Sequence, residues 1–278
     1  MRTKYLRSRK RIELIVTYRC NRRCYNCEAM VRQAPSNEIM EINQIQKFVD
    51  ESIQKQYKWD NIRVLGGEPT LHPNIEKIIE ILENYRKNYN KNMVITIVTN
   101  GYGKAVNKKL DILKNKFKVT IENSNKKTDI QTGFWPVNQA PIDILEYENM
   151  DFSKGCWIPT VCGMALDMYG FYPCTAAAAF ARVAGIDLGR KKLPEKEDSL
   201  EEIFTVFCRL CGHYYNLIND VFDEEVADCN NAEKLEKVIR SYQQNDCGKN
   251  KIDSEVISKT WKKIIENYNC KIPHLIRY

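Results

Sequence analysis

The sequence predicts an α/β fold: a partial, open (β/α)6 TIM-like barrel, followed by a small C-terminal extension and a helical tail. Strand-like and helix-like segments alternate from residue 11 to about residue 147, which is the pattern of βα units around a parallel sheet. Roughly five or six strands can be recognised, too few for the eight of a closed barrel. After Asp151 the alternation stops, and the density of cysteine, aromatic and glycine residues rises.

The first half of the barrel is defined by apolar strands and amphipathic helices. Residues 11–17 (RIELIVT) read as a buried strand. Residues 41–57 carry apolar side chains at a helical period, and residues 61–65 (NIRVL) form a short strand that ends in a glycine pair. Residues 74–89 form a second amphipathic helix, whose start lies next to Pro73.

The second half of the barrel repeats this alternation. Residues 91–99 (KNMVITIVT) predict a strand that ends at an Asn-Gly pair, and residues 104–115 predict a helix. Residues 117–122 (FKVTIE) predict the next strand, and we expect a further strand at residues 142–147.

The rest of the chain divides into two further parts. We assign residues 1–150 to the barrel, residues 151–215 to the extension and residues 216–278 to the tail. In the extension, the run MALDMYGFYPC fits a β-hairpin with its turn at Tyr169-Gly170. The tail is expected to be helical, most clearly at residues 231–242 and 254–268.

Composition excludes several classes of protein. The chain of 278 residues has a formal net charge of +7, with 43% apolar and 28% charged residues. Its lysines are interleaved with Asn, Ile and Glu on helix-like stretches, and no nucleic-acid recognition motif groups them with aromatic residues. No apolar run approaches the ~18 residues of a membrane span, and no secretory signal is present. We therefore expect a cytoplasmic protein with neither a membrane nor a nucleic acid as partner.

Three of the eleven cysteines, Cys20, Cys24 and Cys27, form a CX3CX2C loop directly after the first strand. Cytoplasmic thiols are kept reduced, so this many cysteines indicate metal or redox chemistry rather than disulfides. Four cysteines normally hold a [4Fe–4S] cluster, whereas three leave one iron open to chelate a ligand. The alternative is a zinc loop, which would need further ligands such as the distant Cys208–Cys211 pair.

The segment CNRRCYNC resembles the signature of the radical SAM superfamily. The resemblance implies a [4Fe–4S] cluster on Cys20, Cys24 and Cys27 that binds S-adenosylmethionine (SAM). The family usually has an aromatic residue immediately before the last cysteine, where it lies by the adenine. Here that position is Asn26 and the aromatic residue is Tyr25, and both are assigned to cofactor binding.

A second motif follows the second strand. Gly66, Gly67, Glu68 and Pro69 resemble the GGEP motif that contacts the methionyl amino group of SAM in this family. The glycines let the backbone approach a ligand closely, and Glu68 could accept a hydrogen bond from an ammonium group. Polar residues at the ends of the third and fourth strands either form simple turns or, as the resemblance implies, contact the ribose and carboxylate of SAM: Thr99, Asn100, Glu122, Asn123 and Ser124.

A second group of cysteines lies in the extension. The spacing C-x13-G-x3-C from Cys156 to Cys174, followed by CX2C at Cys208 and Cys211, resembles the SPASM and twitch extensions of radical SAM enzymes. The shorter twitch form fits better and implies one auxiliary [4Fe–4S] cluster on these four cysteines. A zinc site of Cys208, Cys211 and His213 is the rival interpretation.

Cys162 is left over by this assignment. It could replace Cys156 as a ligand, serve as a buried structural thiol, or donate a hydrogen atom to a substrate radical. The remaining cysteines have irregular spacings in the tail and are interpreted as structural: Cys229, Cys247 and Cys270.

The resemblance also implies an activity. Such an enzyme cleaves SAM to a 5′-deoxyadenosyl radical, which abstracts a hydrogen from the substrate, and a flavodoxin or ferredoxin supplies the electron. An auxiliary cluster suggests net oxidation, as in the compact twitch dehydrogenases. Because the cluster loop begins at residue 20, leaving no room for an amino-terminal peptide-recognition domain, we expect a small sugar or cyclitol substrate. The alternatives are a radical epimerase, a peptide-modifying enzyme and, more remotely, a non-catalytic iron–sulfur or zinc protein.

Overall fold

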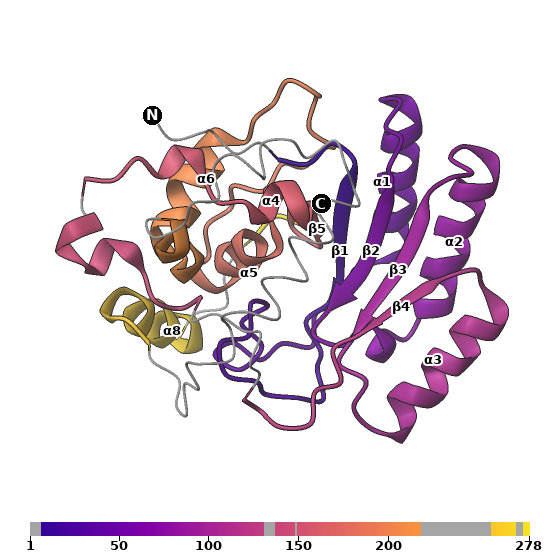
Figure 1. Ribbon diagram of the computed structural model, residues 1–278, viewed down its shortest axis with the longest axis horizontal. Helices are drawn as coiled ribbons and strands as arrows, with labels where there is room; N and C mark the ends of the chain where they lie inside the picture. Colours follow the sequence, from indigo (N-terminus) through magenta and orange to yellow (C-terminus); the bar gives the residue numbers. More distant parts are fainter. Residues whose placement is uncertain (1–6, 131–136, 148, 218–256, 271–274) are drawn as a thin grey trace.

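The computed structural model describes residues 7–130, 137–147, 149–217, 257–270 and 275–278 (Figure 1). Within them, six strands form one sheet in the order β4-β3-β2-β1-β5-β6. Neighbours from β4 to β5 are parallel, and β6 is antiparallel to β5. The strands are β1 (Arg11–Thr17), β2 (Asn61–Gly66), β3 (Val94–Thr99), β4 (Thr120–Asn123), β5 (Met164–Asp167) and β6 (Gly170–Tyr172).

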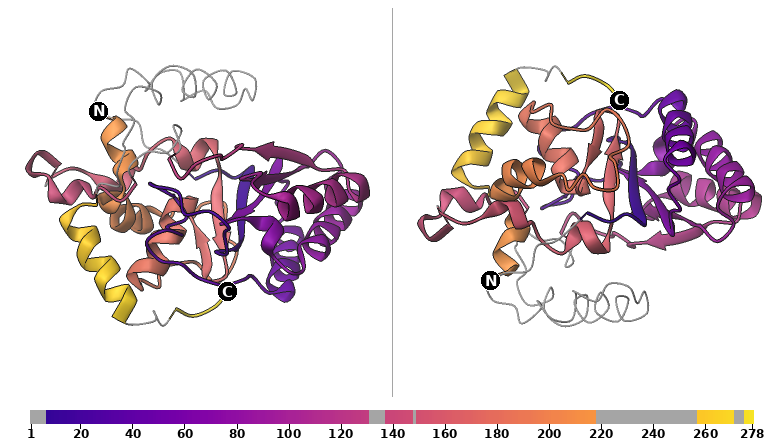
Figure 2. Two further views of the ribbon diagram at one scale, coloured as in Figure 1. Left: turned by 90° about the horizontal axis from the view of Figure 1, so that it is seen from below. Right: turned by 90° about the horizontal axis from the view of Figure 1, so that it is seen from above.

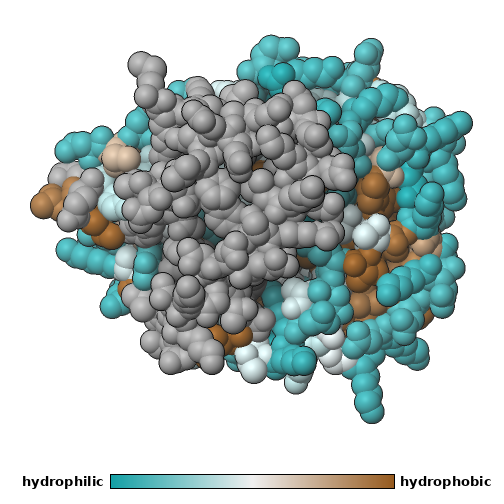
Figure 3. All heavy atoms as spheres, in the orientation of Figure 1, coloured by the Kyte–Doolittle hydropathy of each residue, from teal (hydrophilic) through white to brown (hydrophobic). Residues whose placement is uncertain are grey.

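Three helices cover one face of this sheet: α1 (Ile42–Gln54), α2 (Ile75–Asn88) and α3 (Lys104–Lys116), as Figure 1 shows. Their apolar stripes pack on alternate strand residues, which on β1 are Ile12, Leu14 and Val16. Successive side chains of a strand point to opposite faces, so the intervening residues of β1 point away from these helices. In the half of the molecule that contains α1–α3, Figure 3 shows hydrophilic side chains around a smaller hydrophobic area.

The other face of the sheet is the concave interior of the partial barrel. On this side α5 (Thr175–Ala184) packs against β5 and β6, and α6 (Glu201–Phe207) and α8 (Lys259–Cys270) pack on α5. The short α4 (Ile158–Val161) lies at the start of β5. Trp261 of α8 is fully buried and packs against Phe180 of α5, with 4.7 Å between ring centroids. Figure 2 shows α8 on the outer side of this group, away from α1–α3.

Most predicted elements are confirmed within one to three residues, and the fold is the predicted α/β partial barrel. The predicted strand at residues 142–147 is wrong, because two 3-10 turns form there instead, Pro141–Asp143 and Leu145–Tyr147. Pro141 has no N–H for a sheet ladder and sits at the first position of its turn, which favours the helical geometry.

The predicted hairpin of the extension is confirmed, with its turn at Met168-Tyr169, one residue earlier than predicted, and it continues the barrel sheet. Its strands β5 and β6 pair antiparallel, and β5 lies parallel to β1. Within the extension and tail, the described 3-10 turns are Phe152–Lys154, Cys208–Leu210 and Gly212–Leu217. The division of the chain at residues 151 and 216 stays a prediction.

Part of the predicted tail lies outside the described residues. These include the helix expected at 231–242, together with Cys229 and Cys247. The helix expected at 254–268 is observed as α8 at Lys259–Cys270. No helix in the described ranges is long and apolar enough to cross a membrane.

Candidate active site

The cysteine triplet lies in the loop that follows β1, at the carboxyl edge of the sheet. Cys24 is buried, Cys20 and Cys27 are half-buried, and all three are free thiols. Burial raises the pKa of Cys20 to about 11 and also raises the pKa of Cys27, while the Lys126 ammonium opposes the rise at both. The three thiols are close enough to interact electrostatically: Cys27 raises the pKa of Cys20, and Cys24 raises the pKa of Cys27.

Backbone amides of the same loop point at these sulfur atoms. The N–H of Arg22 donates to the thiol of Cys20, and the N–H groups of Ala29 and Val31 donate to that of Cys27, which lowers both pKa values against the effect of burial. Amide donors to sulfur stabilise thiolates and the anionic clusters that thiolates hold. The donor set of this loop therefore fits a [4Fe–4S] cluster held by three cysteines.

Glu68 connects the strand ends around this loop. Its side chain is fully buried and accepts hydrogen bonds from the N–H and hydroxyl of Thr70, from the Thr99 hydroxyl and from the N–H of Asn100, at 2.7 to 3.2 Å. Asn100 Nδ2 in turn lies 3.7 Å from Cys20 Sγ. The carboxylate of the GGEP segment therefore holds the end of β3 against the cysteine loop.

The glycines of that segment allow β1 and β2 to meet. A Cβ at Gly66 would lie 2.2 Å from the carbonyl oxygen of Thr17, and one at Gly67 would lie 2.3 Å from that of Arg19. The sequence suggested a close approach of backbone to ligand. The structure shows that the backbone of the cysteine loop itself makes such an approach.

The remaining strand-end residues divide into two groups. The Ser124 hydroxyl donates to the carbonyl oxygen of Thr99 at 2.9 Å, and the amide of Asn123 fills the space where a Cβ of Gly101 would lie. These residues join the ends of β3 and β4 beside the cysteine loop. Glu122 differs, because its carboxylate turns into the barrel and pairs with Arg63 at 2.7 Å.

Tyr25 and Asn26 occupy the rim of the cysteine loop. The guanidinium of Arg32 lies 3.9 Å from the ring centroid of Tyr25, and the Tyr25 N–H donates to the carbonyl oxygen of Asp129 at 2.8 Å. Asn26 is 4% exposed and has a φ of 54°, a left-handed conformation that Asn tolerates better than most residues. The contact of either residue with adenine stays a prediction, as does the role of the buried Pro69.

The structure also brings together the four cysteines assigned to the extension. Cys156, Cys174, Cys208 and Cys211 line one apolar cavity beside the barrel, with His213 at its wall. Burial raises the pKa of Cys211, and the other three thiols raise it further, which places all four within electrostatic range of one another. Among the described residues, no three His, Cys, Asp or Glu side chains surround one point as ligands of a single metal ion do.

Cys162 lies apart from this group. It does not line the cavity of the four cysteines, and the charged groups that act on its thiol are Glu13, Arg63, Glu28 and Glu122 of the barrel interior. Burial, followed by the charge of Glu13, raises the pKa of Cys162. Its thiol is therefore neutral and lies within electrostatic range of these barrel groups.

Comparison with known proteins identifies the first half of the chain. Residues 14–131 match the model of the Radical SAM superfamily. These residues are a radical SAM domain. The family implies a [4Fe–4S] cluster and SAM, which the cysteine loop described above fits.

Curated relatives match less than half of the chain. A GTP 3′,8-cyclase of Aliarcobacter butzleri (strain RM4018) is 28% identical over 121 residues, which are 42% of this chain and 36% of that protein. A probable GTP 3′,8-cyclase of Methanococcus maripaludis (strain C6 / ATCC BAA-1332) is 31% identical over 101 residues, which are 36% of this chain and 32% of that protein. The match thus spans about a third of the length of these relatives.

Two solved structures resemble the chain more weakly. A crystal structure of BtrN in complex with AdoMet and 2-DOIA aligns over 80% of this chain and 93% of that chain, with a TM-score of 0.41 and 14% identity. BtrN in an open conformation aligns over 80% and 92%, with a TM-score of 0.35 and 16% identity.

The interior of the radical SAM domain holds a charged layer that the sequence analysis missed. Arg63 of β2 donates to Glu13 of β1 and to Glu122 of β4, and the Thr175 hydroxyl donates to Glu13. Glu13 and Arg63 are register partners at inward positions. The signal was a charged residue inside each of two largely apolar strands, Glu13 in RIELIVT and Arg63 in NIRVL.

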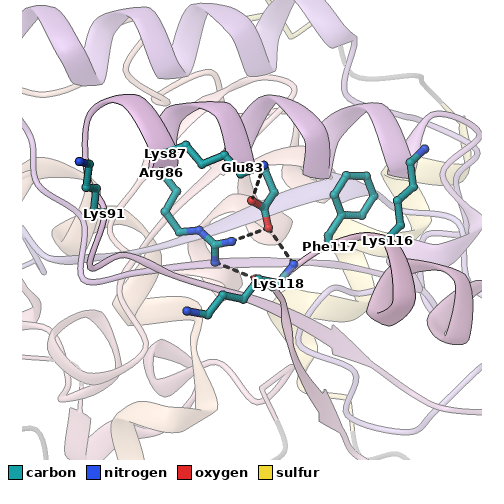
Figure 4. A pocket seen from close by; sticks show the side chains of 7 residues that line it. All are labelled: Glu83, Arg86, Lys87, Lys91, Lys116, Phe117 and Lys118. Atoms are coloured by element: carbon teal, nitrogen blue, oxygen red, sulfur yellow. Dashed lines mark hydrogen bonds and ion pairs between the residues drawn. The ribbon is translucent and has the colours of Figure 1, made fainter.

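A separate hollow on the outer surface contains none of the predicted site residues. It lies between α2 and the start of β4, at the amino-terminal ends of the strands, opposite the cysteine loop. Figure 4 shows that Arg86 donates to Glu83 and to the backbone of Lys118, so the central charges of the hollow satisfy one another. This hollow is therefore not part of the candidate site.

Proposed function

We propose that the chain is a radical SAM enzyme that oxidises a small, carbohydrate-like substrate inside the barrel. Cys20, Cys24 and Cys27 would hold the [4Fe–4S] cluster that binds SAM, and Glu68 and Asn100 keep the neighbouring strand ends against their loop. When bound, these cofactors supply a 5′-deoxyadenosyl radical, which takes a hydrogen atom from a substrate carbon. The chain orients the substrate and shields it from water.

The single observation that supports oxidation is the convergence of Cys156, Cys174, Cys208 and Cys211 on one cavity beside the barrel. Four thiols of this arrangement suit a second [4Fe–4S] cluster, which would accept the second electron from the substrate. A flavodoxin or ferredoxin would supply the first electron, as expected for a cytoplasmic enzyme.

Iron content and SAM cleavage test this proposal together. Anaerobic reconstitution should give about eight irons per chain in the natural protein and about four in Cys208→Ser/Cys211→Ser. Both proteins should form 5′-deoxyadenosine, and only the natural protein should oxidise substrate. A content of about four irons per chain in the natural protein would rule out the auxiliary cluster. A lack of 5′-deoxyadenosine would favour a non-catalytic iron–sulfur or zinc protein.

A second candidate function is favoured by the position of Cys162. Its neutral thiol lies within electrostatic range of Glu13 and Arg63, a place that would suit a hydrogen-atom donor to a substrate radical. The enzyme would then be an epimerase, or would modify a peptide without net oxidation. Product made in D2O would gain one carbon-bound deuterium by this route, and Cys162→Ala would stop its formation, whereas oxidation removes two hydrogens from the substrate.

The names of the curated relatives give GTP as another possible substrate. The barrel interior argues against it, because Glu13, Glu28 and Glu122 all act on the same thiol of Cys162 and would repel a triphosphate. A small polar substrate without phosphate agrees better with these charges.

A further inference from the structure

The charged layer of the barrel is built at positions where an inert core would be apolar. Glu13 lies opposite Arg63 in the β1–β2 register, and small residues flank the pair: Ala165 opposite Glu13 on β5, and Thr96 opposite Arg63 on β3. Interiors of small barrels are normally filled by large branched apolar side chains. This layer instead places an ion pair between small side chains.

Burial makes this arrangement costly for the fold alone. The side chain of Glu13 is 6% exposed and that of Arg63 is 16% exposed. Removing such charges from water costs free energy that their attraction repays only in part, and apolar residues of similar size often stabilise more. The layer opens to solvent at β4, where the side chain of Glu122 is 54% exposed. A ligand can therefore reach the layer from this edge.

The groups available to a ligand are mainly acceptors. Arg63 directs one nitrogen to Glu13 and the other to Glu122. Glu122 and Glu28 each use one carboxylate oxygen, for Arg63 and His213 respectively, and within the described residues their second oxygens accept no hydrogen bond. A ligand that fits must therefore bring hydrogen-bond donors.

The charge of the barrel interior also favours a ligand that brings hydrogen-bond donors. At Arg63, the carboxylates of Glu13 and Glu122 face a single guanidinium, so this part of the layer has more acidic than basic groups. Glu28 is paired with His213 and lies within electrostatic range of the Lys126 ammonium. A phosphate or carboxylate on the ligand would meet repulsion in this partly desolvated space, whereas hydroxyl or ammonium groups would find acceptors.

We infer that Glu122, Glu28 and Arg63 form the substrate subsite of the barrel and select a neutral or cationic, donor-rich small molecule, such as an amino- or polyhydroxylated ring. The inference rests on the proposed function, because it assumes that the substrate occupies the barrel interior. It goes further by assigning the residues that recognise the substrate and the ligand charge that this subsite favours.

Three ring compounds that differ in charge provide the test: glucosamine, glucose and glucose 6-phosphate. Equilibrium dialysis against anaerobically reconstituted holoenzyme with SAM gives their dissociation constants. Glucosamine should bind most tightly and glucose 6-phosphate at least about tenfold more weakly, as expected when one ligand charge meets one partly exposed carboxylate. Glu122→Gln should reduce this ratio to less than about threefold, because it removes the charge from an exposed side chain without changing its size.

Glu80→Gln is the matched control, since Glu80 lies on the exposed surface of α2 and pairs with the exposed Lys77. It should leave the ratio unchanged. The subsite is refuted if glucose 6-phosphate binds as tightly as glucosamine, if none of the three compounds binds, or if Glu122→Gln keeps the ratio of the natural protein. Formation of 5′-deoxyadenosine in the same samples separates this result from a failure of the proposed function.

Discussion

The imidazole of His213 lies 3.0 Å from the carboxylate of Glu28, and this hydrogen bond joins the two cysteine loops. Glu28 directly follows Cys27, and His213 comes two residues after Cys211. Burial would raise the pKa of Glu28, but the hydrogen bond and charge of His213 outweigh it and lower the pKa. The side chain of His213 is only 11% exposed, so the contact is shielded from water.

A double-mutant cycle on this pair should reveal a favourable coupling. Glu28→Ala, His213→Ala and the double variant should show a coupling energy of about 1–2 kcal/mol in urea unfolding, because a carboxylate is a charged acceptor in a partly buried place. The control is the exposed pair Lys77–Glu80 on α2, which should couple by less than about 0.5 kcal/mol. A Glu28–His213 coupling no larger than this control would show that the loops fold independently.

Glu68→Gln should destabilise the protein although it changes few atoms. The carboxylate accepts from Thr70, Thr99 and Asn100, and glutamine would place an NH2 group against some of these donors. Leaving a buried donor without its acceptor costs about 1–3 kcal/mol, so we expect a loss of this size in the free energy of unfolding.

The same substitution at Glu80 is the control for Glu68, since its pair with Lys77 is exposed. Glu80→Gln should change the free energy of unfolding by less than about 0.5 kcal/mol. Equal stability of the two variants would mean that Glu68 does not hold the strand ends together.

Much of the fold could be predicted from periodicity, because each early strand is a short apolar run and each early helix has an apolar stripe. The prediction from periodicity was wrong for residues 142–147. Their apolar residues alternate as in a strand, but Pro141 favours a helical turn there. Local patterns cannot show which segments find sheet partners, since pairing depends on the rest of the chain.

The site was predictable where its residues are close in sequence. The CX3CX2C spacing alone placed Cys20, Cys24 and Cys27 in one loop. The Glu13–Arg63 pair was missed because it depends on the register of β1 against β2. The other missed contact is Glu28 with His213, residues that lie 185 positions apart and meet only when α6 and the following turns pack on the barrel. No sequence motif records such a contact.

Asp167 should make the stability of the protein depend on pH. It is fully buried at the end of β5, where it accepts the hydroxyl of Tyr18 at 2.8 Å and the N–H groups of Tyr169 and Gly170. Burial raises its pKa from 3.8 to about 7, against the lowering effects of the Tyr18 hydrogen bond and the Arg182 charge. Glu38 adds to the rise.

The raised pKa of Asp167 determines whether stability rises or falls with pH. The folded chain holds the proton of Asp167 more tightly than the unfolded chain does. Its contribution to stability is therefore complete below about pH 4 and is lost as the pH rises to about 7. Over this range the free energy of unfolding should fall by up to about 4 kcal/mol relative to Asp167→Asn, which keeps the shape but does not titrate. Urea unfolding of both proteins from pH 4 to 8 measures the difference, and a constant difference would contradict the assignment.

Gly67→Ala should disturb the cysteine loop specifically. The new Cβ would lie 2.3 Å from the carbonyl oxygen of Arg19 and 2.9 Å from the Cβ of Cys20. Backbone cannot move aside as a flexible side chain does, so the loop itself must shift. The hydrogen bond from the N–H of Glu68 to the carbonyl oxygen of Arg19, 2.7 Å long, would be lost in that shift. We expect the variant to retain about four irons per chain, those of the proposed auxiliary cluster, because Cys20 leaves its place.

Gly103→Ala is the matched control for this clash. Gly103 has a φ of 99°, so alanine is strained there, but the nearest heavy atom to its Cβ would be 3.7 Å away, on Asn21. This variant should lose about 1 kcal/mol of stability and keep the iron content of the natural protein, because strain without a clash leaves the loop where it is. Iron and 5′-deoxyadenosine measured on both variants separate the two effects. Full iron content in Gly67→Ala would show that Cys20 tolerates a wider gap between β1 and β2 than the geometry allows.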